Sequence, residues 1–334
     1  MTSRPSVLIL GARGRFGQAA THAFASAGWR VLAQRRSTGI ATQAVPHVHW
    51  LDMPVHDAAA VCQAAGHADV VVHAMNPVYT DAAWKREVPA QMEAAIAIAR
   101  GLGSLLMFPG NVYNFGAGMP AVLREDTPWH PTNAKGSARV VAEKRLRDVA
   151  DLHGLSSVVV RAGDFFGSGT GSLFDRVLAS KLTRGRMGYP AGLDIPTAWA
   201  YLPDLAQTFV QLAQRRDTLQ GAHSFHFRGH PLTGQDWRDA LTPLARAQGW
   251  LAADAPLRLD ALPWPLIRAA GLVLPTWRSL VSTRYIWNTP HMLDNRRLLE
   301  RIGAEPHTPL SQAAQQSLAD MGLLTHVPPP RLAT

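Results

Sequence analysis

The sequence predicts an α/β fold, in which a doubly wound parallel sheet is combined with a smaller, mostly helical C-terminal lobe. In the first half of the 334-residue chain, apolar runs of strand length alternate with segments of helical periodicity. A glycine-rich turn joins the first such pair, and the run 68–74 (ADVVVHA) is apolar and β-branched along most of its length. A strand with apolar side chains on both faces is typical of a parallel sheet that helices cover on both sides.

The individual elements follow from local patterns. Ser6–Leu10 (SVLIL) is an apolar run that ends at Gly11, and apolar residues then recur at helical spacing from Phe16 until Gly28 ends the helix. In the same half we expect further strands at 29–34, 47–52, 68–74, 104–108 and 157–163, and further helices at 90–100 and about 133–153. After Gly167 the alternation is lost, and helices are expected at 204–214, 234–248, 263–274 and 310–321.

The composition excludes several classes of function. Cys62 is the only cysteine, so an intrachain disulfide is excluded and a reducing, cytoplasmic location is expected. The first apolar run is too short for a signal peptide and leads directly into a glycine turn. The formal net charge of +9 comes mostly from scattered arginines without interleaved aromatic residues, so no nucleic-acid partner is predicted.

Membrane and metal sites are not predicted either. The most apolar helix candidate, 264–274 (WPLIRAAGLVL), contains Arg268 and is too short to span a bilayer, so we expect a buried or partner-facing helix and no membrane partner. Three histidines, His223, His226 and His230, lie close together in the sequence. No carboxylate accompanies them at ligand spacing, and a strand would send the first two to opposite faces.

The turn GARGRFG places three glycines, Gly11, Gly14 and Gly17, between the first strand and the first helix. A tight turn, close approach of the backbone to a pyrophosphate and close packing of helix on strand all require glycine at such positions. The motif therefore predicts a Rossmann-type dinucleotide site. The cofactor-binding residues expected from it are Gly11, Arg13, Gly14, Arg15, Phe16 and Gly17.

The end of the second strand indicates which dinucleotide is bound. An NAD site usually offers an Asp or Glu there for the ribose hydroxyls, whereas this strand ends in Gln34, Arg35 and Arg36. Guanidinium groups match the 2′-phosphate of NADP(H). We therefore predict that NADP(H) is preferred, with NAD(H) as a possible second choice. The alternative is that both arginines are ordinary surface residues.

These signals suggest a division of the chain. Residues 1–170 form the expected Rossmann-type dinucleotide-binding domain, to which 194–215 return. Residues 171–193 and 216–326 form the expected substrate lobe, and residues 327–334 (VPPPRLAT) are expected to form a flexible tail.

The glycine spacing, Leu51–Asp52 after the third strand, VVHAMNP after the fourth, RAGDFFG (161–167) and AYLPDLA (200–206) together resemble the extended and atypical short-chain dehydrogenase/reductases. That group includes the NAD-dependent epimerase/dehydratases, and the resemblance covers roughly the first two-thirds of the chain. It implies that further residues contact the cofactor: Asp52 and Met53 at the adenine, Ala74, Met75 and Asn76 on the adenosine side, and Ala162, Gly163 and Phe165 near the nicotinamide.

In that family a Ser or Thr, a Tyr and a Lys carry out the proton transfer. The resemblance puts Asn111 at the Ser position, Lys135 at the Tyr position and Arg139 at the Lys position, so all three are changed. Asn111 can still form hydrogen bonds with a carbonyl, and Arg139 can still bind ribose hydroxyls. Lys135 beside that guanidinium is expected to have a lowered pKa and to act as acid or base.

Alternatives for the catalytic positions remain open. Lys135 is equally well explained as a solvated lysine in the first turn of its helix, and Tyr113 is the rival proton donor. Glu143, one turn beyond Arg139, is a candidate partner for that arginine.

The sequence therefore predicts an NADP(H)-dependent oxidoreductase of the atypical short-chain dehydrogenase/epimerase type that acts on a small carbonyl, alcohol or sugar-like substrate. The alternative is a non-catalytic NADP(H)-binding sensor or scaffold, because the Tyr and Lys are missing. A homodimer is possible through the helices that flank the sheet, as in many members of the family.

Overall fold

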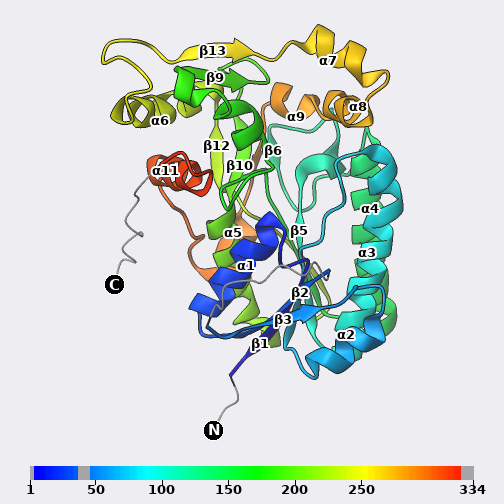
Figure 1. Ribbon diagram of the computed structural model, residues 1–334. Coiled ribbons are helices and arrows are strands. Elements are labelled where there is room, and N and C mark those ends of the chain that lie inside the picture. Colours follow the sequence, from blue (N-terminus) through cyan, green and yellow to red (C-terminus); the bar gives the residue numbers. More distant parts are fainter. Residues whose placement is uncertain (1–3, 37–45, 325–334) are drawn as a thin grey trace.

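A computed structural model describes residues 4–36 and 46–324 of the chain. Its centre is a seven-stranded sheet in the order β11-β7-β5-β4-β1-β2-β3 (Figure 1). Every neighbouring pair in this sheet is parallel. The strands are β1 (Ser6–Leu10), β2 (Arg30–Arg35), β3 (Val48–Asp52), β4 (Val70–His73), β5 (Leu105–Gly110), β7 (Ser157–Arg161) and β11 (Ala222–His226). The predicted fold class is confirmed, including the strands expected in the first half.

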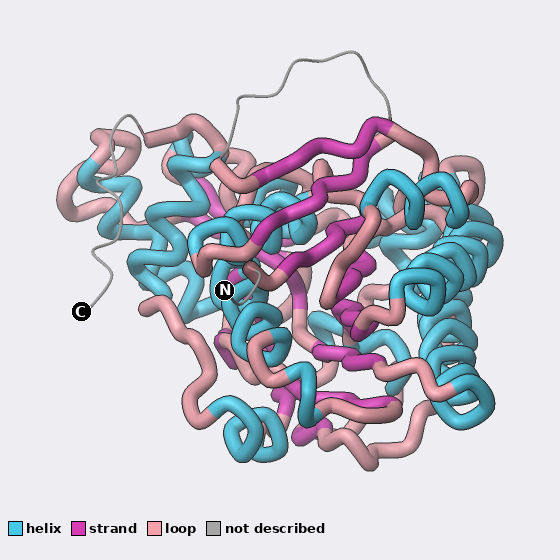
Figure 2. Tube along the Cα trace, turned by 90° about the horizontal axis from the view of Figure 1, so that it is seen from below, coloured by secondary structure: helices cyan, strands magenta, loops and turns pink. Residues whose placement is uncertain are grey.

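Helices cover both faces of the sheet, as Figure 2 shows. One face is covered by α1 (Arg15–Ser26) and α5 (Leu202–Ala213), and the other by α2 (Ala58–Ala65), α3 (Asp81–Leu102) and α4 (Ala134–His153). The strand interiors are fully buried between these layers. This double burial explains the apolar, β-branched runs that predicted a parallel sheet.

Two helices of this half differ from the prediction. Helix α3 begins at Asp81, not at residue 90, because Thr80 caps it by accepting the Ala83 N–H and because the helix tolerates Pro89 in its interior. Helix α2 was not predicted, since its eight residues are mostly alanine and carry little apolar periodicity.

The lobe contains small sheets as well as helices. Strands β8 (Asp164–Phe166), β10 (Thr197–Tyr201) and β12 (His230–Leu232) form one sheet, β9 (Arg186–Tyr189) pairs with β13 (Arg258–Ala261), and β6 (Val122–Leu123) pairs with β14 (Met292–Leu293). Its helices are α6 (Gly234–Ala247), α7 (Trp264–Gly271), α8 (Pro275–Ser282), α9 (Tyr285–Asn288) and α11 (Leu310–Asp320). These strands are too short to give a clear alternation in the sequence.

Some segments lie elsewhere than the sequence suggested. β11 and α10 (Arg296–Ile302) come from the stretch assigned to the lobe, yet β11 is the edge strand of the main sheet and α10 packs on it and on α5. The helix expected over 263–274 ends at Gly271, where the chain turns into α8. The expected tail 327–334 is outside the described residues. Within them, no helix is long and apolar enough to cross a membrane.

A buried ion pair joins α4 to the end of β7. Arg161 and Glu143 are 1% and 2% exposed, and the Arg161 guanidinium donates to both carboxylate oxygens, at 3.2 and 2.5 Å. The same arginine donates to the carbonyl of Asn111 at 2.5 Å, and Asn114 donates to Glu143 at 2.9 Å. Glu143 therefore forms its direct ion pair with Arg161, while its carboxylate also acts on Arg139, the partner that the sequence suggested, through their electrostatic attraction.

Replacing Glu143 with Gln should destabilise the protein by about 3 kcal/mol, because removing one partner leaves a buried charge without compensation. The matched control is Glu93→Gln, which breaks the exposed pair with Arg145 and should cost no more than about 1 kcal/mol. Urea unfolding of both variants checks this. Equal, small losses would contradict the role given to the buried pair.

Candidate functional site

The glycine turn after β1 is built as a close-packed cradle. Gly11 has a φ of +79°, which favours glycine, and its carbonyl accepts the Gly14 N–H at 2.9 Å. A Cβ on Gly17 would lie 2.3 Å from the Gly11 oxygen, so the first turn of α1 packs directly on the turn. A Cβ on Gly14 would meet the same oxygen at 3.3 Å, which is tight but not forbidden.

The start of α1 faces this turn without a side-chain cap. Gly14 is the N-cap residue and makes no side-chain hydrogen bond, so the first N–H groups of the helix, at Arg15, Phe16 and Gly17, are not capped. A helix N-terminus with such groups favours an anion. This arrangement fits a pyrophosphate. The guanidinium of Arg15, however, donates to the Gly167 carbonyl at 2.6 Å, so this side chain ties the turn to the chain after β8.

The end of β2 offers no acceptor pair for ribose hydroxyls. Gln34 is buried, where its side chain accepts the Gly11 N–H and donates to the Met53 carbonyl. Arg35 forms a two-pronged ion pair with Asp52 and lies 4.8 Å over the Trp50 ring. The predicted cofactor residues Arg35, Asp52 and Met53 are therefore brought together here, and Arg36 follows as an exposed residue.

The loop after β4 lies across the turn. Ala74 and Met75 border it, since the backbone of Met75 is about 3.1 Å from where a Gly11 Cβ would lie. Asn76 accepts a hydrogen bond from the Arg139 guanidinium at 3.2 Å. Arg139 is 7% exposed, and its Nε has no partner within the described part of the chain. An orphaned buried donor beside the glycine cradle fits the ribose of a dinucleotide.

Aromatic rings enclose that guanidinium. Its central carbon lies 5.1 Å from the centre of the Trp84 ring and 4.7 Å from that of Phe108. Burial lowers the pKa of Arg139 to about 10, partly offset by the Glu143 carboxylate. The side chain therefore remains a cation at neutral pH, held between rings by cation–π contacts.

Lys135 is fully buried and is not the solvated lysine that the sequence left open. Its amine pairs with Asp81 at 2.5 Å and lies 4.4 Å over the ring of Tyr79. Asp81 also accepts a hydrogen bond from Ser279 of α8. Burial lowers the pKa of Lys135, and the hydrogen bond that its amine donates to Asp81 opposes that shift. The predicted direction of the shift is thus found, but its cause is burial and not the neighbouring Arg139.

Three tyrosines meet beside this ion pair. The hydroxyls of Tyr79 and Tyr113 are 3.2 Å apart, and Tyr79 donates to Thr283 at 3.1 Å. Tyr285 lies close enough to interact electrostatically with Tyr79. Burial raises the pKa of Tyr79 to about 12 and that of Tyr113 well above its usual value, so both hydroxyls remain protonated and can donate hydrogen bonds at neutral pH.

A carboxylate completes this group. Asp164 is the first residue of β8, and its oxygen accepts the Trp287 indole N–H at 2.6 Å. No cation pairs with it among the described residues, and burial raises its pKa to about 6. Asp164, Tyr79, Tyr113 and Tyr285 all keep an intermediate fraction of their surface exposed. We call these four residues the proton cluster.

The remaining predicted residues surround the proton cluster. Asn111 lies two residues before Tyr113, and its side-chain oxygen accepts the Tyr113 N–H at 3.1 Å, which leaves its amide N–H₂ and one lone pair of that oxygen to bind a ligand. Ala162 and Gly163 lead into β8, where a Cβ on Gly163 would lie 2.0 Å from the Ala198 carbonyl. Glycine there lets β8 pair closely with β10 and so places Asp164 and Phe165.

Sequence reasoning missed several of these groups. Asp164 is the one acid in the motif RAGDFFG (161–167), where its neighbours are mostly apolar. An acid in such a setting is a signal that could have identified it as a site residue. Asp81 is an acidic residue in the first turn of α3, a common position for Asp, so nothing in the sequence indicated that it would pair with Lys135. Ser279, Thr283 and Trp287 lie more than a hundred residues further along the chain, and only the fold brings them to the site.

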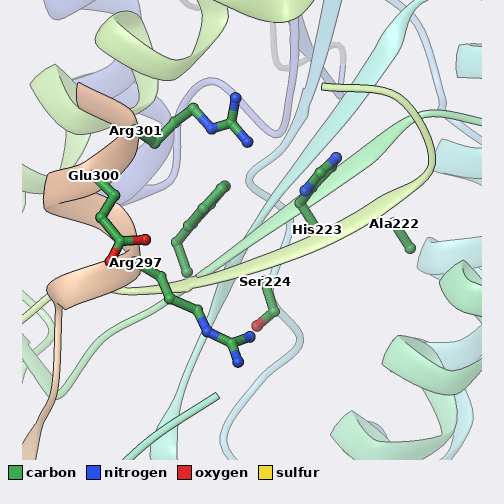
Figure 3. A pocket seen from close by; sticks show the side chains of 7 residues that line it. Ala222, His223, Ser224, Arg297, Glu300 and Arg301 are labelled. Carbon is green, nitrogen blue, oxygen red and sulfur yellow. The ribbon is translucent and has the colours of Figure 1, made fainter. Parts of the chain in front are cut away.

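A surface cavity of about 350 Å³ lies away from this site. Figure 3 shows Arg297, Glu300 and Arg301 of α10 facing His223 and Ser224 of β11 across it. It borders the edge strand β11, whereas the glycine turn follows the carboxyl end of β1, and Tyr79, Tyr113 and Asp164 follow those of β4, β5 and β7. Within the described residues no group of histidine, cysteine and carboxylate side chains could hold a metal ion.

The fold and the site define a dinucleotide-binding α/β protein, with a phosphate cradle and polar side chains beyond the carboxyl ends of the strands. Residues 7–226 match the family model of the NAD dependent epimerase/dehydratase family. The chain therefore belongs to that family. The comparison with curated proteins gives no match.

Solved structures share the fold. UDP-glucose 4-epimerase from Brucella ovis, in complex with NAD, is 16% identical with a TM-score of 0.73, covering 95% of this chain and 98% of its own. The Bordetella bronchiseptica enzyme WbmH, in complex with NAD+, is 17% identical with a TM-score of 0.69 and the same coverage. The UDP-Glc/GlcNAc 4-epimerase from Campylobacter jejuni is 13% identical with a TM-score of 0.71, covering 95% and 98%.

Two glycine variants should separate binding from folding. Gly14 has a φ of −67°, so Gly14→Val should fold but fill the space that a pyrophosphate needs. Gly17→Val should fail to fold stably, because its Cβ would collide with the Gly11 oxygen. In thermal melts with saturating NADPH, the wild type should gain about 2.7 kcal/mol at a hundredfold excess over Kd, and Gly14→Val nothing. A Gly14→Val protein that still gains stability would place the cofactor elsewhere.

Proposed function

We propose that this chain is an NADP(H)-dependent oxidoreductase or epimerase that acts on a small carbonyl, alcohol or sugar-like substrate. The observation that carries the proposal is that the uncapped glycine cradle and the proton cluster lie beyond the same edge of the sheet. The cradle would hold the pyrophosphate and Arg139 the ribose. The cofactor, when bound, supplies or accepts a hydride.

The preference for the 2′-phosphate rests on the end of β2. Gln34 cannot replace the usual carboxylate, because both ends of its amide are occupied inside the protein. The nearest acid, Asp52, is neutralised by Arg35. The Arg35 guanidinium also lies over the Trp50 ring. Arg36 follows it in the sequence, and Arg13 lies in the glycine turn. A dianionic phosphate is favoured where positive charge exceeds negative charge.

NADPH should therefore bind about ten- to a hundredfold more tightly than NADH, which corresponds to about 1.5–3 kcal/mol for charge-assisted hydrogen bonds. The double variant Arg35→Ala, Arg36→Ala should remove most of this preference. The control Arg30→Ala changes an exposed arginine at the opposite end of the same strand and should leave the ratio unchanged. Fluorescence titration measures both affinities. Equal affinities in the wild type would sink the proposal for NADP(H).

The proton cluster supplies the second half of the reaction. In the reducing direction the bound cofactor would supply the hydride to the carbonyl carbon, and Asp164 would give its proton to the carbonyl oxygen and become a carboxylate. Trp287 then stabilises that carboxylate through its N–H. In the oxidising direction Asp164 takes the proton from the alcohol. A pKa of about 6 suits either task near neutral pH.

The other polar groups hold the substrate and the cluster in place. Tyr113 stays protonated and would donate its O–H toward an oxygen bound beside Asp164, whereas the single O–H of Tyr79 donates to Thr283 and holds that ring in place. Lys135 acts as a positioning residue. Its amine forms an ion pair with Asp81 and a cation–π contact with the Tyr79 ring. The sugar-nucleotide epimerases with the same fold support a hydroxyl-bearing, sugar-like substrate.

Asp164→Asn should abolish turnover, by at least about a hundredfold, and leave NADPH affinity unchanged. Tyr113→Phe should reduce turnover less, because it removes one hydrogen bond. Lys135→Met should lower turnover through misplacement of Tyr79. In the wild type, the rate of reduction should fall as pH rises through about 6, because the protonated acid is lost, and the rate of oxidation should rise.

These variants also test the alternative of a non-catalytic NADP(H)-binding protein. A wild type that binds NADPH but turns over no aldehyde, ketone or nucleotide sugar would favour that function. Turnover could also survive Asp164→Asn but be lost in Lys135→Met, with a pH–rate profile that follows the titration of a lysine. That result would assign the proton transfer to Lys135.

A further inference from the structure

The α7–α8 hairpin carries an unusual apolar surface. In Figure 1 these helices lie side by side at one end of the lobe, far from the N-terminus of the chain. Among the described residues ten large apolar side chains are exposed, and five of them belong to this hairpin: Leu266 (70%), Leu272 (77%), Val273 (77%), Leu274 (48%) and Trp277 (41%). Three of the five are consecutive and form the turn between the helices.

The backbone N–H groups of this turn all have a partner within the protein. The N–H of Leu272 donates to Ala269, and those of Val273 and Leu274 both donate to Ala270, while Pro275 has no N–H. The Arg278 guanidinium donates to the carbonyls of Gly271 and Leu272, at 3.0 and 2.7 Å. A turn whose N–H groups and most of whose carbonyls are already bonded loses less free energy when it enters an apolar medium than an open loop does.

The charged residues of the segment that carries the turn all have one sign. From residue 261 to residue 293 the sequence contains no Asp or Glu, but it contains Arg268, Arg278 and Arg284. Arg268 and Arg278 are exposed. An apolar tip flanked by arginines, with a tryptophan beside it, matches the chemistry of an anionic phospholipid surface, where acyl chains lie below negatively charged headgroups.

We propose that the α7–α8 hairpin docks the protein on an anionic membrane surface, with Leu272, Val273 and Leu274 entering the bilayer interface. This differs from the sequence analysis, which expected no membrane partner. No spanning segment is involved. The hairpin also forms part of the site, because Ser279 of α8 donates to Asp81 and Thr283 accepts from Tyr79. Docking would therefore turn this wall of the site toward the membrane.

The full-length protein is tested by co-sedimentation with phosphatidylcholine vesicles, with and without phosphatidylglycerol. We expect binding to the anionic vesicles that weakens as salt is raised. The triple variant Leu272→Gln, Val273→Gln, Leu274→Gln should bind about tenfold more weakly or worse, and Arg268→Gln about fivefold more weakly. NADPH affinity serves as the fold control and should be unchanged in each.

The matched control is Val78→Gln, Val141→Gln, Leu152→Gln, which changes three apolar residues of similar exposure on other helices and loops (69%, 55% and 73%). It should bind vesicles like the wild type. Absence of vesicle binding, or equal loss in both triple variants, would overturn the proposal. So would a dimer in sedimentation velocity that the hairpin variant alone dissociates, because a second copy would then cover the surface.

Discussion

The buried pair between Arg161 and Glu143 is the constraint on which the geometry of the site depends. It joins the carboxyl end of β7 to the middle of α4, and the same guanidinium holds the carbonyl of Asn111 after β5. Phe115 and Trp129 lie 5.2 and 5.5 Å from that guanidinium and exclude water from it. This ion pair thus fixes the position of α4 relative to the end of β7 and the loop after β5.

The consequences extend along α4. Lys135, Arg139 and Glu143 follow one another at intervals of one turn on the same face, and each is buried. Their partners come from three different elements, since Asp81 begins α3, Asn76 follows β4 and Arg161 ends β7. Buried ion pairs contribute little net stability, because desolvation offsets their attraction. Their effect here is positional: they set the register of α4 against α3 and the sheet.

Local chemistry explains which features the sequence predicts. The main sheet strands and the glycine turn depend on burial on both faces and on backbone conformation, which neighbouring residues determine. The lobe strands, α2 and the α7–α8 turn lack such local signals. Pairings such as Glu143 with Arg161, Lys135 with Asp81 and Asp164 with Trp287 depend on the tertiary fold. The spacing along α4 favoured Arg139 as the ion-pair partner of Glu143. In the structure the direct partner is Arg161, at the end of β7.

The electrostatics of Asp164 distinguish it from these structural charges. Its pKa in the folded chain is about 6 against an ordinary 3.8, so the folded state gains stability as pH falls from about 6 toward 3.8 and is destabilised above 6. A difference of that size corresponds to about 2–3 kcal/mol at neutral pH. Lys135 and Glu143 each have an oppositely charged partner, but within the part of the chain that the structure describes Asp164 has only an indole N–H. This cost, at a carboxyl group that is partly exposed among three protonated tyrosines, is the reason that the proposed proton transfer is assigned to Asp164.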